Sequence, residues 1–237
     1  MTRVLFLFFS FSFSLVTMAH AAQYTVKVGD SRVIIKQEHN GCGKAFVHLH
    51  QNETTALEAA RAVVNTRGGS VLTLVHSGGR NIVFHVGRTR YEFDPNRIYT
   101  DKGIKKTLLQ FGKYSPTAHR DVKKLANKIT SLLPQGKIIA VHNNSTYSLK
   151  NYFPGHGLAC DAQSLNVNKR HFYRNFYLVT KQRDYVRLRQ LNFNSIWQAP
   201  NAMDDGSLSV YLGKNRYVNV EAGYDQLAAQ IKMLKYA

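Results

Sequence analysis

Residues 45–66 read AFVHLHQNETTALEAARAVVNT, and this stretch decides the fold class. The apolar run 45–49 is typical of a short buried strand. A helix is expected to begin directly afterwards, at about Thr54, and to end near Thr66 before Gly68. Its apolar face is marked by Leu57, Ala60 and Val64. A strand that passes straight into a helix is the repeating unit of α/β folds, so the stretch predicts that class.

The rest of the chain continues this alternation of apolar runs and amphipathic stretches. Further helices are expected at 117–133 and 224–234. Further strands are expected at 71–75, 82–86, 91–93, 137–141, 176–179, 195–197, 208–211 and 217–220. The pattern predicts one α/β domain over 22–237, with a central mixed, mostly parallel sheet and helices on both faces.

Composition narrows the function classes. Of 237 residues, 44% are hydrophobic and 19% charged, which excludes a disordered chain. The 32 basic and 14 acidic residues give a net charge of +18, which indicates a polyanionic partner or setting.

The N-terminal residues predict the compartment. Arg3 precedes an apolar stretch that runs to Met18, and Ala19-His20-Ala21 has the small-x-small pattern of a cleavage site. We therefore expect residues 1–21 to be a cleaved signal peptide, which makes the protein periplasmic or secreted. Export argues against a nucleic-acid partner. No later apolar stretch reaches the ~18 residues of a membrane span, so stable membrane insertion is not expected.

The chain has two cysteines, Cys42 and Cys160. In an oxidising compartment an even number permits a disulfide. The sequence favours one bridge between them, with two free thiols as the alternative.

Polar side chains follow several of the expected strands, at the sheet edge where α/β proteins bind ligands. His50 and Glu53 are three residues apart at a strand-to-helix turn, and His142 follows the strand 137–141. Nitrogen and oxygen donors of this kind suit Zn²⁺, and three protein ligands are typical of a catalytic site. Glu221, after the strand 217–220, is then a candidate general base. Because side chains alternate along a strand, His48, His50 and His142 form a rival ligand set.

The order of these motifs resembles the zinc carboxypeptidase superfamily, which includes metallocarboxypeptidases and the succinylglutamate desuccinylases and aspartoacylases. His50-Gln51-Asn52-Glu53-Thr54 is similar to the family's histidine-glycine-asparagine-glutamate-threonine turn, with Gln51 in place of glycine. Asp94-Pro95-Asn96-Arg97 is similar to its aspartate-x-asparagine-arginine motif. The resemblance covers roughly residues 45–225.

The resemblance implies a role for each site residue. His50, Glu53 and His142 would hold one Zn²⁺, and Glu221 would act as the base. Arg97, aided by Asn96, would bind a substrate carboxylate. Arg80 would stabilise the oxyanion, with Arg88 and Arg90 as its competitors.

Together these features predict a secreted zinc-dependent amide hydrolase, a carboxypeptidase acting on peptides with a free carboxylate. Peptidoglycan-derived peptides would suit the basic chain. The alternatives are an aspartoacylase-type deacylase of N-acyl amino acids and a non-catalytic protein that binds an anionic ligand.

Overall fold

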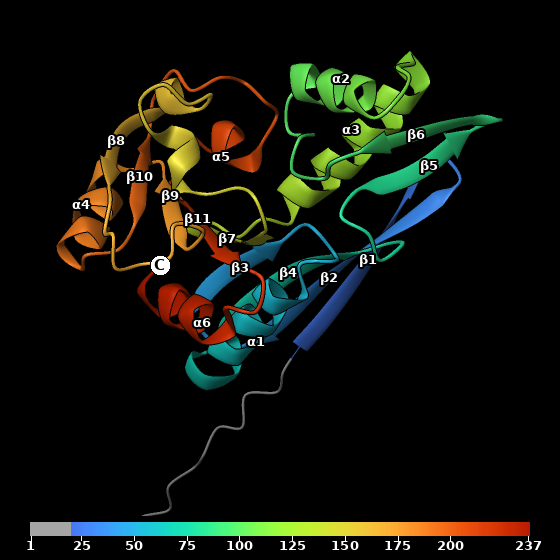
Figure 1. Ribbon diagram of the computed structural model, residues 1–237. Helices are drawn as coiled ribbons and strands as arrows, with labels where there is room; N and C mark the ends of the chain where they lie inside the picture. Colours follow the sequence, from blue (N-terminus) through green and yellow to red (C-terminus); the bar gives the residue numbers. More distant parts are fainter. Residues whose placement is uncertain (1–19) are drawn as a thin grey trace, which may run out of the picture.

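The computed structural model describes residues 20–237 and is built on a nine-stranded sheet (Figure 1). The strand order is β1-β2-β4-β3-β7-β11-β9-β10-β8, and β5 and β6 form a separate hairpin. The strands are β1 (His20–Val28), β2 (Ser31–Asn40), β3 (Lys44–His48), β4 (Gly69–Val75), β5 (Ile82–Val86), β6 (Thr89–Phe93), β7 (Ile138–Asn144), β8 (Ala162–Asn166), β9 (Phe176–Val179), β10 (Ser195–Gln198) and β11 (Tyr217–Gly223). The helices are α1 (Thr54–Arg67), α2 (Asp101–Gln110), α3 (Pro116–Ser131), α4 (Gln182–Gln190), α5 (Leu208–Tyr211) and α6 (Leu227–Tyr236), with 3-10 turns η1 (Leu149–Tyr152) and η2 (Ala159–Asp161).

The centre of the sheet is parallel and its flanks are mixed. Strands β4, β3, β7 and β11 run side by side in one direction, whereas β1 and β2 are antiparallel to their neighbours. Every residue of β7 and of β11 is buried. Strands buried on both faces require cover on both sides, which confirms the expected mixed α/β sheet.

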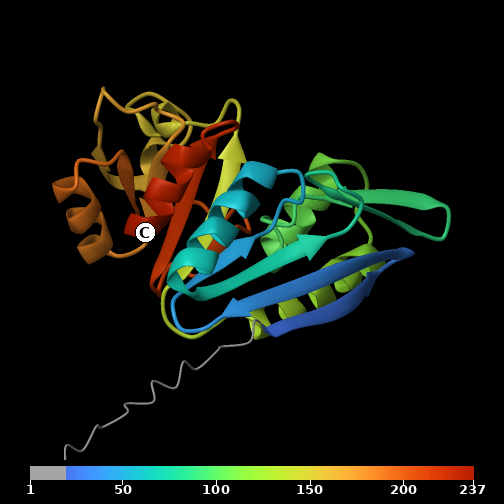
Figure 2. The same cartoon turned by 90° about the horizontal axis from the view of Figure 1, so that it is seen from below.

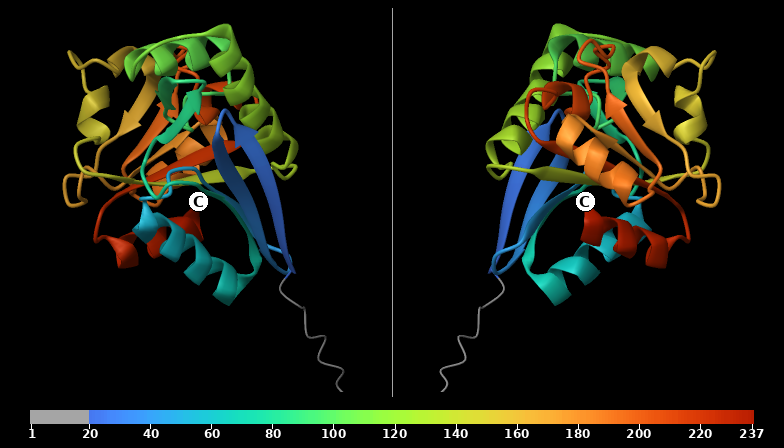
Figure 3. Two further views of the ribbon diagram at one scale, coloured as in Figure 1. Left: turned by 90° about the vertical axis from the view of Figure 1, so that its right-hand side faces the viewer. Right: turned by 90° about the vertical axis from the view of Figure 1, so that its left-hand side faces the viewer.

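Helices supply that cover in two layers. Helices α1 and α6 lie on one face, and α2 and α3 lie on the other (Figures 1 and 3). Successive side chains of a strand point to opposite faces of the sheet, so each central strand contributes to both cores. Phe46 and Ile139 pack in the core beneath α1, and their neighbours Val47 and Ala140 pack in the core beneath α3. Seen from below, the sheet separates the α1 and α6 layer from α3, with β8 to β10 and α4 at one end (Figure 2).

Two sequence predictions about elements need correction. Residues 208–211, expected as a strand, form the short helix α5, because the Ser207 hydroxyl accepts a hydrogen bond from Val210 N and caps a helical turn. A four-residue apolar run does not by itself distinguish a strand from a helix. The elements β1, β2, α2, β8 and α4 had no counterpart in the predicted set.

The expected disulfide is not formed: Cys42 and Cys160 are both free and exposed. Cys42 precedes β3, and Cys160 precedes β8 at the far edge of the sheet. Five strand spacings separate β3 from β8, roughly 24 Å at about 4.8 Å each. A disulfide spans a much shorter distance.

The predicted signal peptide, residues 1–21, lies outside the described residues except for its last two positions. His20 and Ala21 begin β1, where their backbones pair with β2. Among residues 20–237, no helix is both long and apolar enough to cross a membrane.

Candidate metal centre and its cavity

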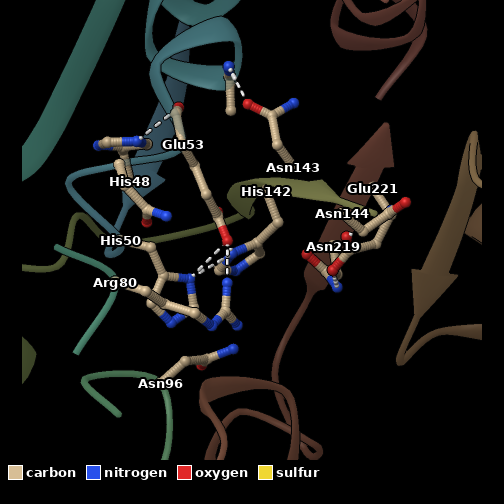
Figure 4. Close-up of polar contacts among 12 residues, drawn as sticks. His48, His50, Glu53, Arg80, Asn96, His142, Asn143, Asn144, Asn219 and Glu221 are labelled. Atoms are coloured by element: carbon tan, nitrogen blue, oxygen red, sulfur yellow. Dashed lines mark hydrogen bonds and ion pairs between the residues drawn. The ribbon is translucent and has the colours of Figure 1, made fainter. Parts of the chain in front are cut away.

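Three buried side chains, two from the turn between β3 and α1 and one from β7, converge on one point (Figure 4). His50 Nδ1 lies 3.2 Å from His142 Nδ1 and 2.9 Å from Glu53 Oε1, and His142 Nδ1 lies 2.9 Å from Glu53 Oε2. Each of the three residues is at most 2% exposed. Donors on one tetrahedral Zn²⁺ are roughly 3.3 Å apart, given bonds of about 2.0–2.1 Å. The triangle therefore fits a small divalent cation with nitrogen and oxygen ligands.

The local sequence explains why these side chains meet. Strand β3 ends at His48, so His50 lies in the turn that follows and leaves the alternation of the strand. Glu53 N donates to His50 O at 3.0 Å, which closes that turn. Glu53 is the N-cap residue of α1, yet its carboxylate makes no capping hydrogen bond. The carboxylate is directed at the two histidines instead.

A second carboxylate orients His50. Asp94, just after β6, accepts a hydrogen bond from His50 Nε2 at 2.7 Å, which leaves Nδ1 facing the centre. Carboxylates in this position fix the ring of a metal ligand and increase its basicity. Burial lowers the pKa of His50, but the charges of Glu53 and Asp94 outweigh burial and raise that pKa to about 9.

Arg80 binds both carboxylates that shape the centre. Its Nη1 donates to Glu53 Oε1, and its Nη2 lies 3.6 Å from Asp94 Oδ2. Of the two competing arginines, Arg90 pairs with Glu92 on the β5–β6 hairpin, and Arg88 is exposed at the turn of that hairpin. The structure thus brings Arg80, of these three arginines, to the centre.

The rival ligand set does not form, because both ring nitrogens of His48 are engaged elsewhere. Nδ1 lies 2.8 Å from Thr73 Oγ1, and Nε2 lies 3.0 Å from the backbone oxygen of Glu53. Burial lowers the pKa of His48 to about 4, so the ring is neutral near pH 7. His48 therefore supports the turn that carries Glu53.

Glu221 lies beside the centre on the neighbouring strand. Strands β7 and β11 are parallel, and Glu221 is in register with His142. Asn144 Nδ2 and Asn219 Nδ2 each donate to one Glu221 oxygen at 3.0 Å (Figure 4). The carboxylate, in a residue only 5% exposed, is therefore held in one orientation.

Asn96 and Arg97 lie in the loop after β6 and belong to the same region. Asn96 N donates to Asp94 Oδ1 at 2.7 Å, and Asn96 Oδ1 accepts from Leu208 N at 3.1 Å. Arg97 Nη1 donates to Asn96 O at 2.8 Å, and its Nε lies 3.4 Å from Asp205 Oδ2. The guanidinium is thus fixed at two points.

All the predicted site residues except His50 line one cavity of about 600 Å³. His50 lies behind Glu53 and His142, at 0% exposure. A larger cavity, about 1050 Å³, lies nearby and shares Gln198, Ala202 and Val210 with the first. Its walls carry Lys181 and Lys214 but none of the converging ligands, so the chemistry belongs to the smaller cavity.

Sequence reasoning missed several residues of this cavity. Asn144 ends the buried strand β7, and a polar residue there faces the ligand edge, which was a usable signal. Asn219 lies inside β11, where the signal was a polar residue within an apolar run. Tyr147, Tyr152 and Asp161 lie between β7 and β8, where the short 3-10 turns η1 and η2 give no periodic pattern that marks them.

No protein-family model and no curated protein matches this sequence. Among solved structures, the chain is similar to an aspartoacylase family protein from Mesorhizobium loti. The two share 10% sequence identity and a TM-score of 0.42, over 95% of this chain and 68% of that chain. The metal centre stands on the distances given above, independently of this likeness.

Proposed function

We propose that this protein is a zinc-dependent amide-bond hydrolase in which His50, Glu53 and His142 hold the metal. The convergence of three buried donors within a triangle of zinc-like dimensions is the observation that carries the proposal. A bound Zn²⁺ supplies Lewis acidity toward a carbonyl and lowers the pKa of a water ligand.

The surrounding side chains fit the remaining tasks of amide hydrolysis. The Glu221 carboxylate accepts the proton of the attacking water and passes it to the leaving amine. Its two amide partners keep it in place. Arg80, already within reach of the metal ligand Glu53, stabilises the negative charge that develops on the substrate oxygen.

In the proposed reaction, Arg97 selects substrates that carry a free carboxylate. The planar guanidinium of Arg97 donates two parallel hydrogen bonds to a carboxylate. The backbone oxygen of Asn96 accepts a hydrogen bond from the same guanidinium and holds it in place. A peptide with a free carboxylate, including peptides from cell walls, is therefore the proposed substrate, which makes the enzyme a carboxypeptidase.

A deacylase of N-acyl amino acids is the second candidate. The cavity of about 600 Å³ is within the range of small-molecule sites, and its two arginines suit a small acid. Comparing hydrolysis of peptides with that of N-acyl amino acids separates the two activities.

Kinetics with paired substrates test the role of Arg97. Wild type is expected to hydrolyse a peptide with a free C-terminus much faster than its C-terminal amide, and Arg97→Ala should lose most of that preference. Loss of the ion pair between Arg97 and the substrate carboxylate should raise the activation free energy that corresponds to kcat/KM by roughly 2–5 kcal/mol. Equal processing of acid and amide by the wild type would remove the carboxypeptidase assignment.

Export is part of the proposal: residues 1–21 are removed and residues 22–237 act in the periplasm or outside the cell. Mass spectrometry of the protein from fractionated cells tests this directly. A chain found in the cytoplasm with residues 1–21 intact would contradict it.

A further inference from the structure

The cavity differs in charge from the chain as a whole. The sequence has 32 basic and 14 acidic residues, yet none of the residues that line this cavity is a lysine. The charged residues on its walls are four carboxylates and two arginines: Glu53, Asp161, Asp205, Glu221, Arg80 and Arg97. Arg80 pairs with Glu53 and Arg97 with Asp205, so Asp161 and Glu221 remain without a basic partner on these walls.

Two buried acceptor atoms on the same walls lack a partner. The ionised Glu221 carboxylate only accepts hydrogen bonds, so Asn144 and Asn219 must turn their amide nitrogens toward it. Each carbonyl oxygen Oδ1 then faces away, and neither has a hydrogen-bond partner. The two residues are only 6% and 8% exposed. Because buried polar atoms are normally paired, these oxygens require donors from outside the chain, and the N–H groups of a bound ammonium can supply them.

Aromatic side chains complete this part of the cavity. The hydroxyl groups of Tyr147 and Tyr152 form a hydrogen bond with each other, and the centroids of the two rings are 6.1 Å apart. Tyr152 lines the same cavity as Glu221, Asp161 and Asp205. Burial raises the pKa of Tyr152, the hydrogen bond with Tyr147 lowers it, and the charges of these three carboxylates raise it further. We call Asn144, Tyr152, Asp161 and Asn219 the amine corner.

The chemistry of the corner favours an ammonium group over a metal ion. Among residues 20–237, the group of His, Cys, Asp and Glu side chains with converging ligand atoms is His50, Glu53 and His142, and Asp161 is not in it. An ammonium has three N–H donors and binds to acceptors that are spread over a wall. Aromatic rings add attraction for such a cation.

We propose that the amine corner binds a primary ammonium group of the substrate, which therefore carries an amine as well as a carboxylate. This inference rests on the proposed function and narrows its substrate class. Arg97 holds the carboxylate, the metal centre holds the scissile amide, and Asp161 with the two asparagine oxygens holds the amine.

Three peptides with the same free C-terminal carboxylate test the proposal. The first has a lysine side chain and an acetylated N-terminus, the second has norleucine and a free N-terminus, and the third has norleucine and an acetylated N-terminus. The first two distinguish a side-chain amine from a terminal amine. Wild type is expected to prefer at least one of them to the third by about tenfold or more in kcat/KM.

Asp161→Asn removes the charge and keeps the Oδ1 acceptor that Met203 N uses at 2.8 Å, so the fold should persist. The variant is expected to lose most of the preference while hydrolysing the amine-free peptide at a rate close to that of wild type. Glu58→Gln, which removes an exposed carboxylate on α1, is the matched control and should keep the preference. Asp161→Ser, which also removes the charge and keeps a side-chain oxygen on the side of Met203 N, provides a second variant if Asp161→Asn is unstable.

Equal kcat/KM for all three peptides in wild type would overturn the inference and leave the proposed function intact. Loss of preference in Glu58→Gln as well would also overturn it. If none of the peptides is hydrolysed, the proposed function is wrong, and calorimetric binding of the same peptides then decides the inference. An equal Kd for all three would reject it, and a tenfold tighter Kd for an amine-bearing peptide would support it.

Discussion

Asp94 shows how one residue acts on the metal centre through another. It accepts from His50 Nε2, from Asn96 N and at longer range from Arg80, so it joins the metal ligands to the loop after β6. Asp94→Asn keeps an acceptor oxygen but removes the charge that orients His50. We expect zinc affinity to fall by roughly 10–100-fold, with the fold unchanged. Competition with a chromophoric chelator measures the affinity, and an unchanged value would show that Asp94 plays no part in metal binding.

Glu221 is the residue on which turnover depends in this account. Glu221→Gln keeps the shape of the side chain and leaves the metal ligands untouched, but it cannot accept the proton. We expect full zinc content and a kcat lower by roughly 10²–10⁴-fold. Rates close to those of wild type would remove Glu221 from the mechanism.

At the scale of elements, the last turn of α6 is capped by a lysine from a distant strand. Lys44 Nζ donates to three carbonyl oxygens of that turn at 2.7–2.9 Å. Burial, together with the charges of Lys137, Arg187 and Arg67, lowers the pKa of Lys44 from 10.5 to about 8. The unfolded chain therefore binds this proton more tightly, and the free energy of unfolding should rise with pH between about 8 and 10.5.

The comparison that isolates Lys44 is with Lys44→Gln. Urea unfolding at several pH values from 7.5 to 10 should give a shallower rise in the variant than in wild type. Identical slopes in the two proteins would show that Lys44 does not titrate differently on folding.

The loop that carries Asp205 is held against α2 by two glycines in contact. A Cβ on Gly206 would lie 2.5 Å from Arg97 O and from Gly103 Cα, and Gly206 has a φ of +78°. Gly206→Ala should therefore cost roughly 1–3 kcal/mol of stability and displace Asp205 from Arg97. Gly157→Ala, where a Cβ meets nothing within 4 Å, is the control. Equal thermal midpoints for the two variants would contradict this close packing.

At the scale of the whole molecule, the parts of the fold that sequence could predict are those with a local signal. The unit β3–α1 was predicted because its apolar run and its helical periodicity are continuous. The strands β1 and β2 were missed because no element was assigned to residues 22–44, although Tyr24, Val26 and Val28 alternate with polar residues along β1. The 208–211 segment was misread because four residues are too few to show a period.

In the candidate site, too, the features with a local sequence signal were predictable and those that depend on strand pairing were not. The proximity of His50, Glu53, His142 and Glu221 could be predicted because strand ends of a parallel sheet share one edge. The hydrogen bond from Asn144 to Glu221 could not be foreseen, since it exists only once β7 and β11 pair in this register. Asn219 donates to Glu221 from two residues away on the same strand. Net charge was a poor guide to the cavity, because only two of the 32 basic residues, Arg80 and Arg97, line it.

Metal content decides whether His50, Glu53 and His142 form a zinc site. Purified protein, loaded with zinc and dialysed, should contain about one zinc per chain by mass spectrometry. His50→Ala, Glu53→Ala and His142→Ala should retain almost none. His48→Gln, which can still bond to Thr73 and Glu53 O, should retain it, with circular dichroism confirming that each variant is folded. Zinc retained by Glu53→Ala and lost by His48→Gln, or no zinc in the wild type, would contradict the account.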